Sequence, residues 1–438
     1  MNKKLTLIRR SVQLVLGAVL FLSGTHASGA DINATFNASV GRSDNILRTE
    51  DNQIDENLAT VGLELDLLHE SPRLSADVYV NADYIDYLDD SFDSDLEGGA
   101  TAVADYWFLL DRFGWNVQYN FGQQVFDPLA PIRPDNRENV SYLTTGPQVE
   151  FPLGSRFEFK ANADWSDTSY EINPNDQTRL GGRVSIGRLL NAGRTISIVG
   201  SQERVEYDEN LFTPDFDRRS VFLRFESINT RGTFTVDLGV NELELDDADQ
   251  TGDGTLFRVD WMRLLSDGVE LTLGVGTRYS DQGDIFRFFQ NAAFDLVDTE
   301  NVSGVGSPFR NNYGSVIFSM EKPRTRIDLV ALYSDEDYEF VSTFDREVSQ
   351  LNFLLGRDFT TKLFGELGID ASLREFVSVD RDDRDVQYTL SLGFRFSSAL
   401  STVLSYQHFT RSSNQGATEF DEDRIFLRVS YVPRWSRE

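Results

Sequence analysis

The sequence predicts an all-β protein: a transmembrane, antiparallel, up-and-down β-barrel of about twenty strands, with eighteen strands as the neighbouring even count that also fits. Three observations lead to this fold class. Apolar and polar residues alternate along nearly the whole chain of 438 residues, as in strands with one apolar and one polar face. Short and long connections alternate without exception. No stretch after the first thirty residues is apolar over the ~20 residues that a membrane-spanning helix needs.

The first strand shows the pattern most simply. In "DINATFNASVG", residues 31–41, Ile32, Phe36 and Val40 lie on one side and Asn33 and Asn37 on the other. Successive side chains of a strand point to opposite faces. We therefore expect the apolar set to face lipid and the polar set to face a watery interior.

Residues 1–30 have the features of a secretory signal peptide. "MNKKLTLIRR" carries four basic residues and no acidic one, "SVQLVLGAVLFLSG" is apolar, and small residues precede a cleavage site after Ala30 or, alternatively, after Ala27. A membrane anchor is the competing interpretation, but the apolar run is shorter than a spanning helix. We expect residues 31–438 to form a single barrel domain.

Composition excludes one class of partner. The chain has 41 basic and 71 acidic residues and a formal net charge of −30, and the predicted signal peptide removes only basic ones. Such an acidic protein would be repelled by nucleic-acid phosphates, so we expect no nucleic-acid partner. The chain has no cysteine, which is compatible with an oxidising compartment.

The remaining strands follow in order along the chain. We expect them at Ala59–Leu67, Leu74–Tyr84, Leu96–Phe108, Phe113–Phe121, Val140–Phe151, Phe157–Trp165, Leu180–Arg188, Ile196–Val205, Val221–Phe225, Phe234–Val240, Phe257–Trp261, Val269–Tyr279, Tyr313–Met320, Ile327–Tyr333, Val348–Arg357, Leu363–Leu373, Val386–Phe396, Leu400–His408 and Ile425–Tyr431.

The connections favour a membrane barrel over a soluble sandwich or solenoid. Tight links such as "ESPR", "NAGR", "NTRG", "SDG" and "KPRT" alternate with long polar ones such as "FDPLAPIRPDNREN", "DDADQTGDG" and residues 280–312. Outer-membrane barrels have short periplasmic turns and long external loops. Only a closed barrel lets such strands cross hydrocarbon, because an open edge would leave backbone groups unpaired.

Aromatic residues near the strand ends, among them Tyr84, Trp165, Tyr279 and Tyr406, fit the interfacial girdles of such barrels. The last strand, within "RIFLRVSYVPRW", resembles the C-terminal signal that barrels present to the barrel assembly machinery, although "SRE" follows the final aromatic residue. The chain is thus expected in the outer membrane of a Gram-negative bacterium, in contact with its lipid and lipopolysaccharide.

The polar faces of the strands predict what lines the interior. Sixteen or more strands already leave an aqueous channel, unless loops fold inward. We expect the lumen to be lined by Lys160, Asn162, Asp164, Arg183, Arg224, Arg258, Asp260, Gln387, Arg395, Arg424 and Arg428.

Sequence gives little support for an enzyme or a cofactor. After loss of His26 with the signal peptide, only His69 and His408 remain, and neither belongs to a recognisable nucleophile–base pattern. The acidic loop "DDADQTGDGT" fails the calcium-loop pattern, because Thr251 stands at the third ligand position and Arg258 stands where a glutamate should close the loop. We therefore expect no catalytic, cofactor or metal site, and only diffuse bridging of acidic loops to anionic lipopolysaccharide by divalent cations.

One family resemblance bears on function. The stretch 135–190, "DNRENVSYLTTGPQVEFPLG" onward, with "GRSDNIL" near the start of the barrel, resembles the β-barrel porins associated with exopolysaccharide biosynthesis and export gene clusters. The resemblance implies a conduit or accessory component of exopolysaccharide secretion, with polysaccharide export proteins and a polysaccharide chain as partners. A general diffusion porin for small solutes is the alternative, since any wide polar lumen would serve.

Overall fold

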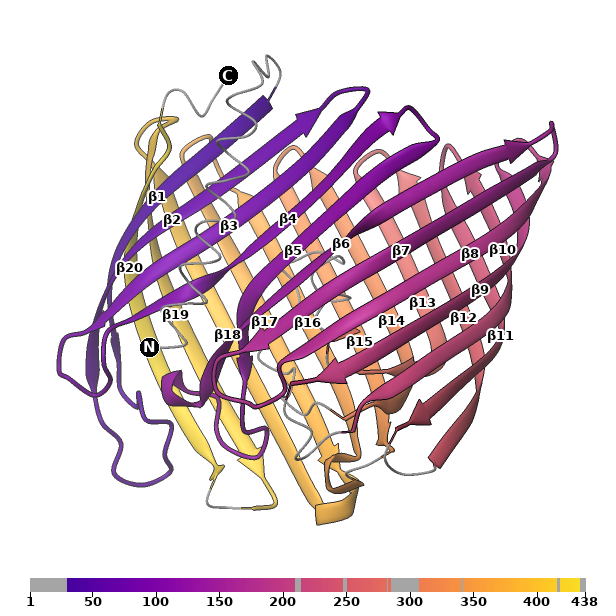
Figure 1. Cartoon of the computed structure of the whole chain (residues 1–438). Coiled ribbons are helices and arrows are strands. Elements are labelled where there is room, and N and C mark those ends of the chain that lie inside the picture. The colour runs from indigo at the N-terminus through magenta and orange to yellow at the C-terminus, as the bar shows by residue number, and fades with distance from the viewer. Residues whose placement is uncertain are drawn as a thin grey trace.

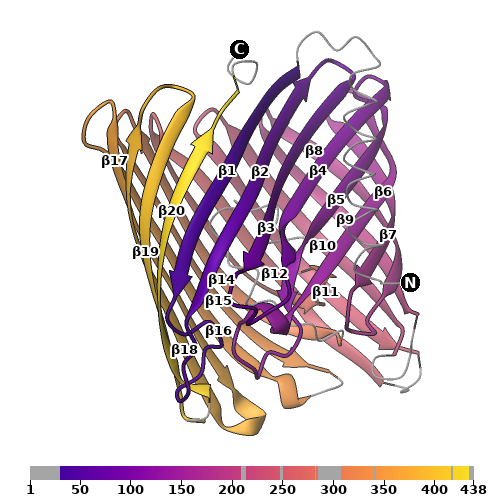
Figure 2. The same cartoon turned by 90° about the vertical axis from the view of Figure 1, so that its left-hand side faces the viewer.

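In the computed structural model the chain forms a closed antiparallel β-barrel (Figures 1 and 2). The structure describes residues 30–208, 214–246, 250–281, 283–284, 307–339, 342–415 and 418–433. The predicted signal peptide, but for its last residue, lies outside these ranges, as do the end of the C-terminal signal and residues 247–249 of the acidic loop. Within the described ranges there is no helix long and apolar enough to cross a membrane.

The described residues form twenty strands. They are β1 Ala30–Ser43, β2 Glu56–Glu70, β3 Leu74–Tyr87, β4 Asp95–Leu109, β5 Phe113–Val125, β6 Arg137–Leu153, β7 Phe157–Tyr170, β8 Gln177–Asn191, β9 Arg194–Tyr207, β10 Phe216–Asn229, β11 Gly232–Leu245, β12 Gln250–Ser266, β13 Val269–Ser280, β14 Phe309–Lys322, β15 Thr325–Tyr338, β16 Arg346–Asp358, β17 Leu363–Phe376, β18 Arg381–Arg395, β19 Leu400–Ser413 and β20 Phe420–Tyr431. Three short 3-10 helices, η1 Pro134–Asn136, η4 Ser342–Phe344 and η5 Val377–Val379, lie in connections between them.

The barrel closes through its first and last strands. Each strand pairs with its neighbour in sequence, and β1 pairs with β20 from Phe36 opposite Tyr431 to Ser43 opposite Arg424. Figure 2 shows this seam, with β20 and β1 side by side and tilted like the other strands. Closure leaves no open sheet edge, which satisfies the requirement that backbone groups in hydrocarbon pair within the protein.

The predicted fold class is confirmed: each expected strand is present in the described ranges, in the expected order. Most strands are longer than expected. For example, Val221–Phe225 becomes Phe216–Asn229 and Val386–Phe396 becomes Arg381–Arg395. The outward-facing residues added at the long-connection end are polar, such as Asp217 and Arg219 in β10, so alternation with an apolar outer face could not reveal them.

Two expectations about the connections were wrong. The link from β17 to β18 is only residues 377–380, as short as the 359–362 turn at the other end, so short and long connections do not alternate without exception. The link "DDADQTGDG" is also shorter than expected, because β12 begins at Gln250. In both places the strands continue beyond the apolar belt and take up residues that the sequence pattern assigned to loops.

The two faces of the sheet differ as the first strand predicted. Ile32, Phe36 and Val40 are exposed on the outer surface. Asn37, by contrast, is buried and donates to the Glu64 carboxylate at 3.0 Å while accepting from the Ser430 hydroxyl at 2.7 Å. Exposed leucine, valine, isoleucine and aromatic side chains recur around the outside from β1 to β20. An apolar surface of this extent indicates a membrane-embedded barrel.

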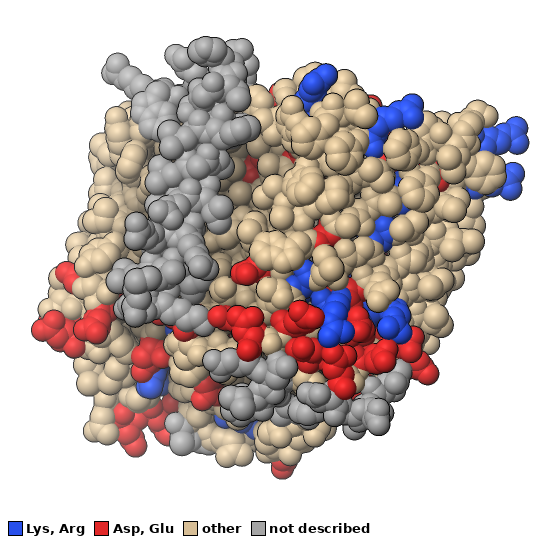
Figure 3. Space-filling view, in the orientation of Figure 1, with Lys and Arg blue, Asp and Glu red and all other residues tan. Residues whose placement is uncertain are grey.

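Charge is distributed unevenly along the barrel axis. On the face seen in Figure 3, acidic side chains gather along the lower edge, where the long connections lie, and basic side chains project from the upper edge at the short turns. Of the expected girdle residues, Tyr84, Trp165 and Tyr406 are exposed, but Tyr279 is buried with Tyr207 and Phe216. The assignment of Tyr279 to the interfacial aromatic girdle was wrong, because its ring packs against neighbouring aromatic and aliphatic side chains.

The assignment of side chains to the lipid-facing or the interior face can be tested near the middle of β12. There Val259 lines an apolar groove on the outer surface, and Arg258 lines a polar cavity. Val259→Arg should destabilise the barrel by roughly 2–4 kcal/mol, because it exposes a charge to hydrocarbon. Arg258→Ser should change stability little. A urea refolding titration in lipid vesicles measures both. Equal losses at the two positions would contradict the assignment.

Candidate functional site

The interior of the barrel is the candidate site. Of the residues expected to line it, five converge on one cavity of about 370 Å³ on the inner wall: Asn162, Asp164, Arg183, Arg224 and Arg258. They come from β7, β8, β10 and β12. Asp260 joins them through an ion pair with Arg258 at 2.6 Å. We call this space the arginine cavity.

Within the arginine cavity most charges are paired. Asp237 of β11 accepts from the Arg224 Nε at 2.7 Å and from its Nη2 at 2.8 Å. The Nε of Arg258 lies 3.5 Å from the same carboxylate. Asn162 donates to Asp164 at 2.6 Å. Bidentate pairing of this kind holds an arginine in one orientation, so the wall is preorganised.

The β5–β6 connection, residues 126–136, folds into the lumen; we call it the inward segment. Asn136 holds it compact: its side-chain amide donates to the carbonyls of Asp127 and Pro131, each at 3.0 Å, and its Oδ1 accepts from the Asp127 N–H at 3.1 Å. Sequence reasoning treated this stretch as an external loop. That expectation was wrong, since Ile132 and Asn136 are buried.

Two arginines from other parts of the barrel hold the inward segment. Arg48, in the β1–β2 connection, donates to the Ile132 carbonyl, and Arg411 of β19 donates to the Ala130 carbonyl at 3.3 Å. Arg48 also donates to Glu422 at 2.9 Å, and its guanidinium lies 4.6 Å from the centre of the Phe409 ring. A buried arginine with several partners fixes a segment firmly, because losing one partner leaves a charge uncompensated. The segment therefore spans from the β5–β6 side of the barrel to the β19–β20 side.

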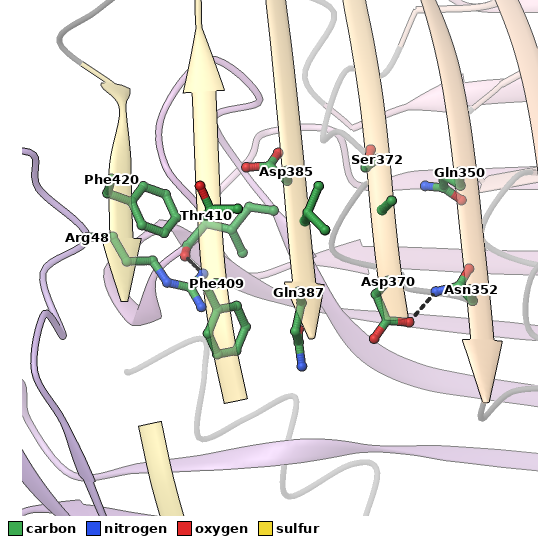
Figure 4. A pocket seen from close by; sticks show the side chains of 13 residues that line it. Arg48, Gln350, Asn352, Asp370, Ser372, Asp385, Gln387, Phe409, Thr410 and Phe420 are labelled. Atoms are coloured by element: carbon green, nitrogen blue, oxygen red, sulfur yellow. Dashed lines mark hydrogen bonds between the residues drawn. The ribbon is translucent and has the colours of Figure 1, made fainter. Parts of the chain in front are cut away.

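Beneath the inward segment lies a smaller recess of about 50 Å³ on the inner wall of β16 to β20, which we call the amide recess (Figure 4). Cross-strand neighbours form its floor: Asn352, Asp370 and Gln387 follow one another across three strands, and Phe409 is the next in that row. The Asn352 amide donates to Asp370 at 2.8 Å. The recess is too small to enclose a ligand, since ligand pockets usually measure roughly 300–1,000 Å³.

A second connection also turns inward. Asp281 and Asp284, just after β13, are buried and meet arginines of distant strands. Arg179 of β8 donates to Asp281 at 2.7 Å, and Arg218 of β10 donates to Asp284 at 2.6 Å. These ion pairs bring the start of this connection over the inner wall of β8 to β10, beside the arginine cavity.

The other expected lining residues lie apart from the arginine cavity. Gln387 belongs to the amide recess, and the Arg424 guanidinium lies 5.1 Å from the centre of the Phe409 ring near it. Lys160 lies 3.7 Å from Glu150, and Arg395 donates to Asp358 at 2.8 Å. Arg428 alternates with the exposed Leu427 and Val429 along β20.

Several interior residues were missed by sequence reasoning. Arg48 and Arg411 hold the inward segment, and Arg179 and Arg218 hold the connection after β13. Arg48 lies in a connection, and the other three lie toward the long-connection ends of their strands, where the alternation is weak. A buried arginine there is recognisable only from its partners, which come from distant parts of the chain.

His408 and its acidic neighbour lie on the outer surface of the barrel, away from the cavities. His408 contacts Asp423 at 2.8 Å on the outer side of β19, and Asp423 also accepts from the Tyr406 hydroxyl at 2.6 Å. In the part of the chain that the structure describes, His408 makes no hydrogen bond to a serine or threonine. No group of three or more histidine, aspartate or glutamate side chains among the described residues could hold a metal ion.

Comparison with known proteins gives one family match. Residues 348–431 match the model of a family described as "Putative beta-barrel porin 2". No curated protein matches the chain.

Solved barrels similar to this chain are distant in sequence. A BenF-like porin from Pseudomonas fluorescens Pf-5 has 11% identity and a TM-score of 0.37, over 93% of this chain and 99% of that one. The ferric enterobactin receptor of Pseudomonas aeruginosa has 10% identity and a TM-score of 0.47, over 93% of this chain and 81% of that one. OccK2 (OpdF) of Pseudomonas aeruginosa, in complex with glucuronate, has 10% identity and a TM-score of 0.34, over 92% of this chain and 98% of that one. At these TM-scores the likenesses carry no argument about function.

The inward segment should narrow the channel. Asn136→Ala removes three hydrogen bonds and should weaken the folded segment by roughly 1–3 kcal/mol. We expect larger and noisier single-channel conductance in a planar bilayer. Asn57→Ala is the matched control, because Asn57 is exposed at the start of β2 and bonds to Asp89 instead. Unchanged conductance in Asn136→Ala would show that the segment does not limit the pore.

Proposed function

We propose that this protein is an outer-membrane channel that conducts a hydrated polysaccharide during exopolysaccharide secretion. The observation that carries the proposal is the inner wall: it is polar, largely charge-paired and preorganised around the arginine cavity, while the outer wall is apolar. The match of residues 348–431 to a β-barrel porin family supports the channel. The resemblance of residues 135–190 to exopolysaccharide-linked barrels supports a polysaccharide as the transported molecule.

A polysaccharide conduit needs contacts that are many and weak. Amide and carboxylate groups such as those of Asn162, Asp260 and Gln387 can each exchange a hydrogen bond with a passing hydroxyl at little net free energy. Because most of these groups already have partners within the wall, a sugar unit gains little by stopping at them. A chain could then slide past without becoming trapped.

A general diffusion porin for small solutes is the second candidate. The inward segment favours it, since a constriction at the long-connection end selects by size. Both candidates predict an open pore, so conductance alone does not separate them. Neither gives the chain a catalytic role.

The proposed setting is the outer membrane of a Gram-negative bacterium, with the acidic long-connection end outside the cell. There its carboxylates would be joined to anionic lipopolysaccharide by divalent cations. The barrel assembly machinery and polysaccharide export proteins are the protein partners we propose.

Orientation is tested with a peptide tag. A tag inserted after Gln53, in the exposed β1–β2 connection, should bind antibody on intact cells. A tag inserted after Ser155, in the exposed β6–β7 turn, should bind only after the outer membrane is permeabilised. Both sites avoid buried backbone, so the barrel should still assemble. The opposite labelling pattern would invert the proposed orientation.

Function is tested by deleting the gene in its source bacterium. We expect extracellular polysaccharide to fall or to accumulate in the periplasm, with uptake of small sugars and antibiotics unchanged. Restoring the gene should restore secretion. Normal secretion with lost permeability to small solutes would favour the diffusion porin and contradict the secretion proposal.

A further inference from the structure

We propose that the arginine cavity is a binding subsite for a carboxylate-bearing sugar, with Arg183 as the group that contacts the carboxylate. This inference rests on the proposed function and narrows it, because it makes the transported saccharide acidic. The cavity measures about 370 Å³ and opens to the lumen. That volume lies in the range of roughly 300–1,000 Å³ typical of ligand pockets.

Arg183 is a cation of this cavity that is not paired with a protein carboxylate. Its side chain is exposed to the lumen, and it makes no hydrogen bond or ion pair to another residue in the described ranges. Arg224 and Arg258 line the same cavity and place like charges near it, in addition to the opposite charges of Asp164 and Asp237. An anion at this position would relieve that repulsion, and a guanidinium binds a carboxylate in bidentate geometry.

The neighbouring arginines are already committed to protein carboxylates. Arg224 is held by two bonds to Asp237, and Arg258 is paired with Asp260 at 2.6 Å. They therefore supply positive potential without needing to move. Arg278 adds a further cation whose Nε has no hydrogen-bond partner within the described structure and whose guanidinium lies 5.7 Å from the centre of the Tyr313 ring.

The wall beside Arg183 is hollow and rich in hydrogen-bonding groups. Gly181, two residues away on the same face of β8, would place a Cβ no closer than 3.9 Å to any neighbouring atom. Asn116, Thr144, Ser201 and Gln202 line the same cavity. A ring bearing hydroxyl groups could therefore enter above Gly181 and bond to these side chains while its carboxylate meets Arg183.

The mixture of charges favours a carboxylate over a phosphate. Asp164, Asp237 and Glu203 also line the cavity. These acidic groups would repel a doubly charged phosphate more strongly than a singly charged carboxylate. A uronic acid unit combines one negative charge with several hydroxyls and thus matches both features of the lining.

The experiment measures block of single-channel current by soluble probes in the full barrel, reconstituted in a planar bilayer. Glucuronate is the test probe, and three other probes serve as controls. Glucose has the sugar ring without the charge, and acetate has the carboxylate without the ring. Glucose 6-phosphate has the ring with a phosphate in place of the carboxylate. We expect glucuronate to block at about one tenth of the concentration that any of the other three requires. Glucose, acetate or glucose 6-phosphate blocking as well as glucuronate would overturn the proposal.

Variants test whether glucuronate blocks the channel by binding in the arginine cavity. Arg183→Gln should raise the blocking concentration of glucuronate about tenfold, since it removes one charge-assisted contact. Gly181→Leu should do the same by filling the hollow without changing any charge. Lys160→Gln is the matched control, because Lys160 is an interior cation of β7 already flanked by Glu150 and Glu158. Equal effects of Arg183→Gln and Lys160→Gln, or full block in Gly181→Leu, would contradict the subsite.

The secretion assay and the bilayer assay together separate the acidic subsite from the secretion role. Secretion lost on gene deletion, with no preference for glucuronate in the bilayer, would leave a conduit for a neutral polysaccharide and reject the acidic subsite. Glucuronate-specific block with normal secretion after deletion would keep the subsite and reject the secretion role.

Discussion

Closure of the sheet between β1 and β20 is the constraint on which the rest of the structure depends. An open edge in hydrocarbon would leave its N–H and C=O groups without partners, so the strands must form a ring. A ring this wide cannot be filled by its own wall side chains. Polar residues on the inner face therefore meet water, one another, or connections that turn inward, as Asn37 shows by bonding Glu64 on β2 and, across the seam, Ser430 on β20.

The inward connections follow from this width. Residues 126–136 and the start of the connection after β13 both depend on arginines from distant strands, such as Arg411 and Arg179. Burying these charges is costly unless each is paired, and the acidic long-connection end supplies the carboxylates. The acidic composition of the chain thus provides the groups that hold the interior together.

Sequence predicted the strands well and the interior only in part. Where one face meets lipid and the other water, alternation is strong, as for Ile32, Phe36 and Val40, and the strand is recognisable from local residues alone. Beyond the apolar belt the outer face becomes polar, so the ends of β10 and β18 were missed. Parity along a strand assigns the residues around Arg183 inward, and five of the assigned residues line one cavity. The position of the inward segment could not be predicted, because it depends on Arg48 and Arg411, which lie far from the segment in the sequence.

The inward segment crosses the lumen and contacts the wall formed by β16 to β20, and cross-linking can detect this contact. The chain has no native cysteine, so Ile132→Cys with Gln350→Cys, both at the amide recess, gives one defined pair. A short bifunctional thiol reagent should join this pair in intact membranes and leave Ile132→Cys with Lys160→Cys unjoined. No cross-link at the first pair in a correctly assembled barrel, or equal cross-linking of both, would contradict the account.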